Sequence, residues 1–332
     1  MLDRVALSCG NGGKQSLELI EQVFKPYLGE FLCADGEDGG VFKAEGAWAM
    51  STDSFVVDPL IFAGGDIGKL SVCGSVNDVC MVGSKPTYLS VGFMLEEGLE
   101  ITLLEQILAS MRTELTLGGL KLLSLDTKVL PKNSMDKIFI NTTALGPTIY
   151  PNLSAKNLKE GQSIIISDFI GSHGALLFAL RSEIQLGVSL QSDCKQLFPI
   201  LKPLFASQYP IYALRDATRG GLAAVLNEWA RASLVDIEIK EASIPVLEEV
   251  RGVCEILGLE PYVLANEGVC VLSVGSVHAT SVCEILAKSG ANPAIIGAVC
   301  KQSQTPRVFL KNAWGSRRYL EMPEGELLPR IC

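Results

Sequence analysis

The stretch that decides the fold is "DIGKLSVCGSVNDVCMV", residues 66 to 82. Small side chains recur along it, which predicts a helix that packs closely against its neighbours. Asp78 stands out on this helix, because a carboxylate on a small, apolar surface is costly unless it is paired or bound to a metal. Two interpretations stay open for Asp78: a functional acid, or an acid satisfied by a neighbouring donor.

Strand and helix patterns alternate on both sides of this stretch. Residues 47–57, "AWAMSTDSFVV", predict a strand that runs into a polar turn at residues 52–54. Residues 15–28 and 101–117 have apolar side chains at helical spacing, and "KLLSLDTKVL" and "KIFINTTAL" predict two more strands. The polar stretch "GPTIYPNLSAKNLKEGQ" predicts a domain boundary near residue 155.

The second half repeats the alternation. Strands are predicted at "SIIISD", "VDIEIK", "GVCVLSV" and "AIIGAVC", and helices after "GSHG", after "DATRGG", over residues 246–257 and at "VHATSVCEILAKSG". The chain of 332 residues is too long for one ordinary core. We therefore expect an α/β protein with domains over residues 1–155 and 156–315, followed by an exposed, mobile tail over residues 316–332.

Composition excludes several classes of partner. The net charge of −9 argues against a general binder of nucleic acid or of acidic membranes. No apolar run approaches the length of a membrane span, and the start of the chain lacks the pattern of a secretion signal. We expect a cytoplasmic protein.

Ten cysteines occur without any CxxC pair, which argues against a zinc ribbon or thioredoxin-like chemistry. Most of them lie in apolar patterns and are expected to be buried as small hydrophobic residues. Cys332, at the end of "GELLPRIC", is different because nothing follows that could bury it. It could be an accident, half of an intermolecular disulfide, a metal ligand or a nucleophile. The two histidines, His173 and His278, are too few for a histidine-based metal site and are expected to be structural, His173 at a loop or helix start.

Glycines and acidic residues indicate a phosphate site. In "CGNGGK", Gly12, Gly13 and Lys14 could bring backbone N–H groups and a positive charge to an anion, although the motif taken alone favours a simple glycine-rich turn. Mg²⁺ prefers carboxylates and bridges phosphate oxygens. The candidate carboxylates near turns or element ends are Asp38, Asp53, Asp66, Asp78 and Asp216, whereas Asp35 and Glu37 are expected to be solvated.

Three further motifs carry polar groups at element boundaries. In "SLDTKVL", Asp126 and Lys128 share one face of a strand and form either a phosphate-binding pair or a surface ion pair. In "RDATRGG", Asp216 precedes a glycine pair and a helix start, which suits a metal-phosphate site. In "ANEG", Glu267 opens an apolar strand, where burial could raise its pKa and make it a base.

Together, "GGK", "TDSFVVDPLIFAGGDIGKLSVCGSVNDVCMVG", "DTKV", "RDATRGGLAAVLNE", "ANEG" and "LPRIC" resemble the HypE family of hydrogenase maturation proteins, in the family's own order. That family is related to aminoimidazole ribonucleotide synthetase. The resemblance implies two α/β domains of the PurM-like type, a homodimer in which the N-terminal domains pair into a β-barrel, and a site for ATP and Mg²⁺. Two departures weaken the match at the N-terminal loop: Cys9-Gly10 stands for His-Gly, and Asp38-Gly39-Gly40 for an Asp-Ala-Ala run.

The resemblance also implies a reaction. A HypF-type carbamoyltransferase loads a carbamoyl group onto Cys332, the enzyme dehydrates this thiocarboxamide to a thiocyanate with ATP, and a HypC–HypD-type complex accepts the cyanide for hydrogenase iron. It implies Glu267 as the base, Lys128 as a charge-stabilising or proton-relaying residue, and the acids listed above around ATP and Mg²⁺, with Asp66 and Asp126 as further nucleotide contacts. Two rival hypotheses remain: a phosphotransferase acting on a small molecule, and a non-catalytic thiol carrier.

Overall fold

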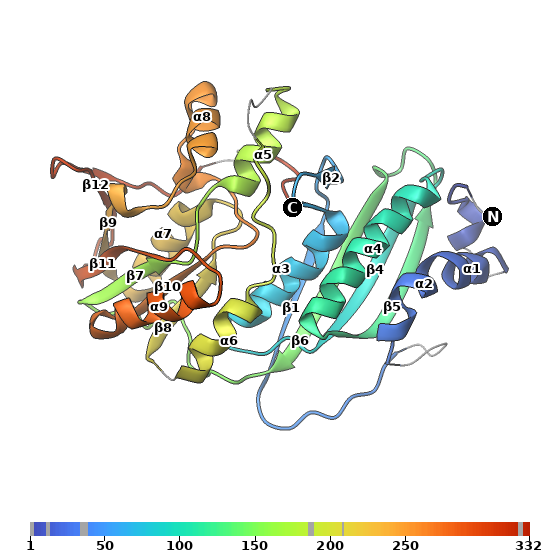
Figure 1. Ribbon diagram of the computed structural model, residues 1–332, viewed down its shortest axis with the longest axis horizontal. Helices are drawn as coiled ribbons and strands as arrows, with labels where there is room; N and C mark the ends of the chain where they lie inside the picture. Colours follow the sequence, from blue (N-terminus) through green and yellow to red (C-terminus); the bar gives the residue numbers. More distant parts are fainter. Residues whose placement is uncertain (1–2, 11–13, 34–38, 185–188, 208, 325–327) are drawn as a thin grey trace.

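The fold comes from a computed structural model that describes residues 3–10, 14–33, 39–184, 189–207, 209–324 and 328–332. The first half of the chain builds a four-stranded sheet in the order β1-β6-β4-β5. Its strands are β1 (Trp48–Phe55), β4 (Tyr88–Glu96), β5 (Lys121–Leu130) and β6 (Ile138–Pro147). Two long helices, α3 (Ile67–Met81) and α4 (Ile101–Gly118), lie side by side against this sheet (Figure 1).

Helix α3 has the close packing that its small residues predict. Asp66 begins it as the N-cap, with its carboxylate accepting a hydrogen bond from the Lys69 N–H at 2.9 Å. A Cβ on Gly68 would lie 2.3 Å from the carbonyl oxygen of Ile107 on α4, and one on Gly74 would lie 2.7 Å from the Phe55 ring on β1. Only glycine therefore allows α3 to contact α4 and the sheet at once.

Strand β1 continues where a polar turn was predicted. Its pairing with β6 runs unbroken from Trp48 to Phe55, so residues 52–54 are extended. Exposure alternates along this part, because Ser51 and Asp53 are half-buried on the α3 side while Thr52 and Ser54 are exposed. The polar side chains obscured the strand period because one face of the strand borders a cleft.

Before the first sheet, the predicted helix over residues 15–28 is divided. It consists of α1 (Lys14–Leu19), a π-helical turn (Ile20–Phe24) and α2 (Lys25–Leu28). A short hairpin of β2 (Ile61–Phe62) and β3 (Gly65–Asp66) precedes α3.

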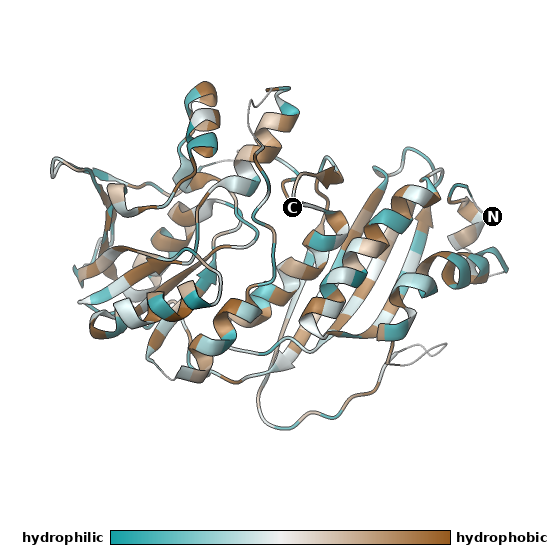
Figure 2. Cartoon of the chain, in the orientation of Figure 1, coloured by the Kyte–Doolittle hydropathy of each residue, from teal (hydrophilic) through white to brown (hydrophobic). Residues whose placement is uncertain are grey.

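The second half builds a seven-stranded sheet in the order β13-β12-β9-β11-β7-β10-β8. Its strands are β7 (Gln162–Ile166), β8 (Ile211–Asp216), β9 (Val235–Lys240), β10 (Cys270–Gly275), β11 (Ala294–Gln302), β12 (Val308–Lys311) and β13 (Arg317–Tyr319). Its helices are α5 (Ser172–Arg181), α6 (Phe198–Ser207), α7 (Gly221–Ser233), α8 (Glu248–Leu257) and α9 (Ala279–Lys288). Figure 2 shows brown, apolar residues running along the strands of both sheets.

Residue 155, near which a domain boundary is predicted, lies in the connection between β6 and β7. The tail predicted to be exposed from residue 316 is tied down at both ends, because Arg317–Tyr319 pair with β12, and Leu320 and Ile331 are buried. No helix in the described part of the chain is both long and apolar enough to cross a membrane.

Candidate active site

An open cleft between the two halves collects carboxylates from three elements. Asp53 lies on β1, Asp78 on α3 and Asp216 at the end of β8, and all three line a cavity of about 490 Å³. Ser51 donates a hydrogen bond of 2.7 Å to Oδ2 of Asp78. The structure therefore brings together three acids that are far apart in the sequence.

Crowding of these acids changes their protonation. Burial raises the pKa of Asp78, and the neighbouring Asp53 carboxylate raises it further against the Ser51 hydrogen bond. Burial, then the charge of Asp78, raises the pKa of Asp216 to about 7, although Arg215 opposes the shift. A cation would relieve this repulsion, so the donor set suits a hard metal ion such as Mg²⁺.

The acids do not form a complete metal cage. Within the described residues, no group of three or more His, Cys, Asp or Glu side chains could hold a metal ion by itself. Mg²⁺ commonly binds through one or two carboxylates together with waters and phosphate oxygens. The cleft fits a metal that arrives with a phosphate ligand better than a permanent metal site.

Behind the cleft, a narrow cavity of about 40 Å³ leads inward. It shares the three acids, Thr218 and Arg219 with the cleft and adds three further lining residues: Gly74, Glu267 and Cys332. The proposed base and the proposed attachment point thus line one small space.

Glu267 is held by its backbone while one side-chain oxygen stays unpaired. The Asp193 carboxylate accepts hydrogen bonds from the N–H groups of Glu267 and Gly268 at 2.9 and 2.8 Å. The residue is 3% exposed, and its Oε1 finds no hydrogen-bond partner among the described residues. Burial raises the pKa of Glu267 well above its ordinary value. A carboxyl group in this state can take up a proton near neutral pH.

Cys332 reaches the cavity because residues 328–332, here called the tail segment, dock between the two halves (Figure 1). The Val56 N–H donates to the Cys332 carbonyl at 2.9 Å, and the Asp58 N–H donates to the Arg330 carbonyl at 3.2 Å. Ile331 is buried, and burial, then the nearby Glu267, raises the pKa of the Cys332 thiol to about 12. The docked sulfur is therefore a neutral thiol.

Two residues that hold the tail segment were missed as site residues in the sequence. His173, expected at a loop or helix start, is fully buried near the start of α5, with Nε2 2.7 Å from the Ile331 carbonyl oxygen. Arg181, at the end of α5, donates to the carbonyls of Pro329 and Arg330. Neither stands in a motif that indicates binding or catalysis, and only the fold shows that both lie on one helix beside the tail segment.

The remaining predicted residues that the structure describes do not line either cavity. Lys14 is exposed beside Glu18, and Asp66 caps α3, so the predicted nucleotide contact of Asp66 has no support in this arrangement. Asp126 and Lys128 form an exposed ion pair of 3.5 Å on β5. Among the residues singled out from the sequence, five lie outside the described part of the chain: Gly12, Gly13, Asp35, Glu37 and Asp38.

Comparison with known proteins agrees with this arrangement. The family models for AIR synthase related proteins match in order, the N-terminal domain over residues 36–148 and the C-terminal domain over residues 159–308. The carbamoyl dehydratase HypE of Escherichia coli (strain K12) is 40% identical over 342 residues, with all of both chains covered. The chain belongs to the HypE family of AIR synthase related proteins. The expected family and the two-domain mixed α/β fold are thereby confirmed.

Other HypE proteins agree in sequence and in structure. The carbamoyl dehydratase HypE of Rhodobacter capsulatus is 37% identical, with 99% of this chain and 98% of the relative covered. A crystal structure of the hydrogenase maturation protein HypE in complex with ATP has a TM-score of 0.91 and 38% identity, covering 98% of this chain and 99% of that one. A HypE in a HypE-HypF complex has a TM-score of 0.80 and 38% identity, covering 92% of this chain and 99% of that one.

Proposed function

We propose that this protein is an ATP-dependent carbamoyl dehydratase that acts in hydrogenase maturation on a carbamoyl group carried by its own Cys332. The observation that carries the proposal is the shared narrow cavity: Cys332 lies at the same space as the unpaired carboxyl of Glu267, and the acid-lined cleft opens next to it. HypE relatives of known structure and name support the activity.

The chemistry follows from the difficulty of removing water from an amide. Hydroxide is a poor leaving group, so the carbonyl oxygen of the S-bound carbamoyl group must first be converted into a better one. Attack of this oxygen on the γ-phosphorus of ATP releases ADP, and loss of one nitrogen proton leaves an S–C(O-phosphate)=NH group. Removal of the second nitrogen proton then forms the C≡N bond as the C–O bond breaks and phosphate leaves.

Glu267 suits the proton removal. Its Oε1 has no other described partner, and its raised pKa lets the carboxylate hold a proton that it has taken up. The Asp193 carboxylate accepts hydrogen bonds from the N–H groups of Glu267 and Gly268, which flank the Cα of Glu267. These bonds fix the position of the backbone from which the Glu267 side chain extends. The enclosed cavity also limits the access of water to the reacting group.

ATP would occupy the cleft with its phosphates toward Asp53, Asp78 and Asp216. Mg²⁺, when bound there, would neutralise phosphate charge that these acids would otherwise repel. Arg219 lines both cavities and is exposed, so it can contact a phosphate directly. Lys128 stays a prediction, because in one chain its ammonium group is exposed beside Asp126 and lines neither cavity.

The proposed partners are a HypF-type carbamoyltransferase, a HypC–HypD-type cyanide acceptor and a second copy of the chain. The HypE-HypF complex of a relative supports the first of these. The face of the first sheet opposite α3 and α4 supports the homodimer, because Met50, Thr52 and Ser54 on that face of β1 are exposed. The cytoplasmic location also stays a prediction.

Mass spectrometry tests the function directly. Cleavage after lysine yields a peptide of residues 312–332, in which Cys332 is the only cysteine. After carbamoylation by a HypF-type enzyme, this peptide should lose the mass of one water only when Mg-ATP is added. An unchanged carbamoyl mass with ATP intact indicates the carrier, and ATP consumption without any change at Cys332 indicates a small-molecule phosphotransferase.

A further inference from the structure

Helix α5 contacts the tail segment at two places. His173, one residue into the helix, contacts the carbonyl of Ile331, and Arg181, its last residue, contacts the carbonyls of Pro329 and Arg330. Three successive carbonyls of the segment are therefore bound by side chains of one helix. None of these contacts involves the side chain of Cys332, so they are independent of its chemistry.

The tautomer of His173 follows from its partners. A carbonyl oxygen only accepts hydrogen bonds, so Nε2 carries the proton that is donated to Ile331 across 2.7 Å. Burial lowers the pKa of His173, which keeps the ring neutral, and Nδ1 then accepts from the Ser192 hydroxyl at 2.8 Å. Phe62 packs edge-to-face against the ring at a centroid distance of 5.4 Å. The ring is thus held in one orientation with one donor aimed at the tail segment.

Arg181 joins the tail segment to the first half of the chain. Its Nε donates to the Asp58 carbonyl at 2.6 Å, while its two terminal nitrogens donate to the tail segment. Arg330 adds a contact from the other side by donating to the Val56 carbonyl at 2.8 Å and pairing with Asp136 at 2.7 Å. The segment lies between α5 and residues 56–58 and can leave only if these bonds break together.

One short loop supports both the histidine and the proposed base. Ser192 binds the His173 ring, and the next residue, Asp193, accepts from the His173 N–H at 3.0 Å and from the Glu267 N–H at 2.9 Å. The two oxygens of a single carboxylate therefore fix the start of α5 relative to Glu267. Because His173 binds the tail segment, this loop fixes the position of the docked segment relative to Glu267.

We propose that His173 and Arg181 are positioning residues that latch the tail segment in its docked state and so set Cys332 beside Glu267. The assignment rests on the proposed function for its purpose, but the latch itself is a property of the docked structure. The two half-reactions make opposite demands on it: loading by a partner enzyme requires release of the tail segment, and dehydration requires docking.

The test measures how accessible Cys332 is in the full chain. The protein is labelled with a maleimide and cleaved after lysine, and label is counted on the peptide of residues 312–332. His173→Ala and Arg181→Ala should each label roughly tenfold faster than the original protein, because each loses hydrogen bonds that hold the docked state. His173→Gln retains an N–H donor at a similar reach and should label near the original rate. Arg251→Ala, a surface arginine of α8, is the matched control.

A second measurement separates positioning from loss of structure. In His173→Ala and Arg181→Ala, carbamoylation should proceed at the original rate or faster, while ATP-dependent dehydration should be slower. Equal slowing of both half-reactions, or unchanged labelling in both alanine variants, overturns the latch. Faster labelling in a protein that never dehydrates its carbamoyl group leaves the latch in place and refutes the proposed function instead. Arg181 is partly exposed, so its variant gives an answer even if His173→Ala does not fold.

Discussion

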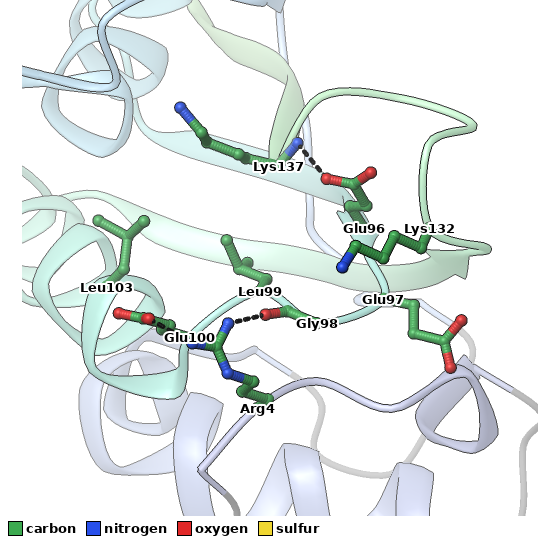
Figure 3. Close-up of a pocket in the computed structure, with 9 residues that line it drawn as sticks. All are labelled: Arg4, Glu96, Glu97, Gly98, Leu99, Glu100, Leu103, Lys132 and Lys137. Carbon is green, nitrogen blue, oxygen red and sulfur yellow. Dashed lines mark hydrogen bonds and ion pairs between the residues drawn. The ribbon is translucent and has the colours of Figure 1, made fainter.

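Two cavities of similar volume show how differently a protein can treat the charged side chains that line a cavity. One, of about 520 Å³, lies at the far end of the first sheet (Figure 3), and the other is the cleft of about 490 Å³ between the two halves. In the first, Arg4 pairs with Glu100 at 2.6 Å and donates to the Gly98 carbonyl at 2.7 Å. In the cleft, burial and then a neighbouring carboxylate raise the pKa of two acids instead: Asp53 acts on Asp78, and Asp78 acts on Asp216.

The difference lies in whether the polar groups already have partners. Glu96 in the first cavity accepts from the backbone N–H groups of Asn133 and Lys137 at 2.6 and 3.0 Å, which fixes the turn after β5. Glu267, behind the cleft, has an oxygen with no described partner. Partnered charges stabilise a fold, whereas a buried group left unpaired is costly and indicates a ligand or a reaction.

The largest effect is expected at Cys332. Cys332→Ser should abolish formation of thiocyanate on the 312–332 peptide, because the sulfur to which the proposed carbamoyl group is attached is gone. The measurement is the mass of that peptide after treatment with the carbamoyltransferase and Mg-ATP. Cys300→Ser, at an exposed cysteine outside the cavity, is the control and should react normally. Normal dehydration by the Cys332→Ser protein would disprove the role of this thiol.

Glu267→Gln should lower the dehydration rate about 10²- to 10⁴-fold, the range expected when a general base is removed. Loading of Cys332 should continue, because the partner enzyme supplies that chemistry. Stability should stay the same or rise, since the amide replaces a carboxyl whose ionisation burial already disfavours.

Glu114→Gln is the matched control for this prediction. Glu114 is also buried, but its carboxylate accepts from the Gln196 amide at 2.8 Å. Its replacement should therefore lower stability while leaving the dehydration of the folded protein intact. If the two variants lose activity equally, the distinction between partnered and unpaired acids fails.

A smaller effect is expected from Asp216 on the pH dependence of stability. Its pKa is about 7 in the folded chain against 3.8 ordinarily, so the folded state binds more protons between these pH values. This contribution is present at low pH and is lost as pH rises through about 7. Asp216→Asn does not titrate, so relative to the original protein it should gain about 1 kcal/mol or more between pH 5 and pH 8.

Urea unfolding at the two pH values, without divalent metal or nucleotide, measures this gain. Asp126→Asn, at an exposed carboxylate of β5, is the control and should show no such change. A pH dependence that is identical in Asp216→Asn and in the original protein would show that neither burial nor the neighbouring Asp78 raises the pKa of Asp216.

The sequence predicted the regular elements better than the polar borders of the cleft. Helix α4 and strand β5 follow their predicted ranges within a residue, because α4 carries a helical apolar period and β5 a strand pattern. Strand β1 extends further than predicted, because the polar side chains at residues 52–54, beside the cleft, resemble those of a turn. Strand β4 was not predicted, although its alternate residues are buried.

Some site residues could be predicted from sequence motifs, and others could be found only from the structure. Asp53, Asp78, Glu267 and Cys332 stood in motifs, and the fold brings them to one space. His173 and Arg181 could not be found this way, since their contacts are to backbone carbonyls about 150 residues away. A backbone partner imposes no complementary residue type on the sequence, so only the docked structure reveals it.

The smallest effect is expected at Arg4, and it completes the comparison of the two cavities. Its ion pair with Glu100 is exposed, so Arg4→Ala should lower the free energy of unfolding by only about 0.5 kcal/mol. Dehydration of the Cys332-bound group should be unchanged, because no residue of this cavity lines the cleft. Urea unfolding and the peptide assay together check both outcomes. A loss of dehydration with normal folding would mean that the first cavity also binds a ligand, and partnering of charges would then no longer distinguish a structural cavity from a functional one.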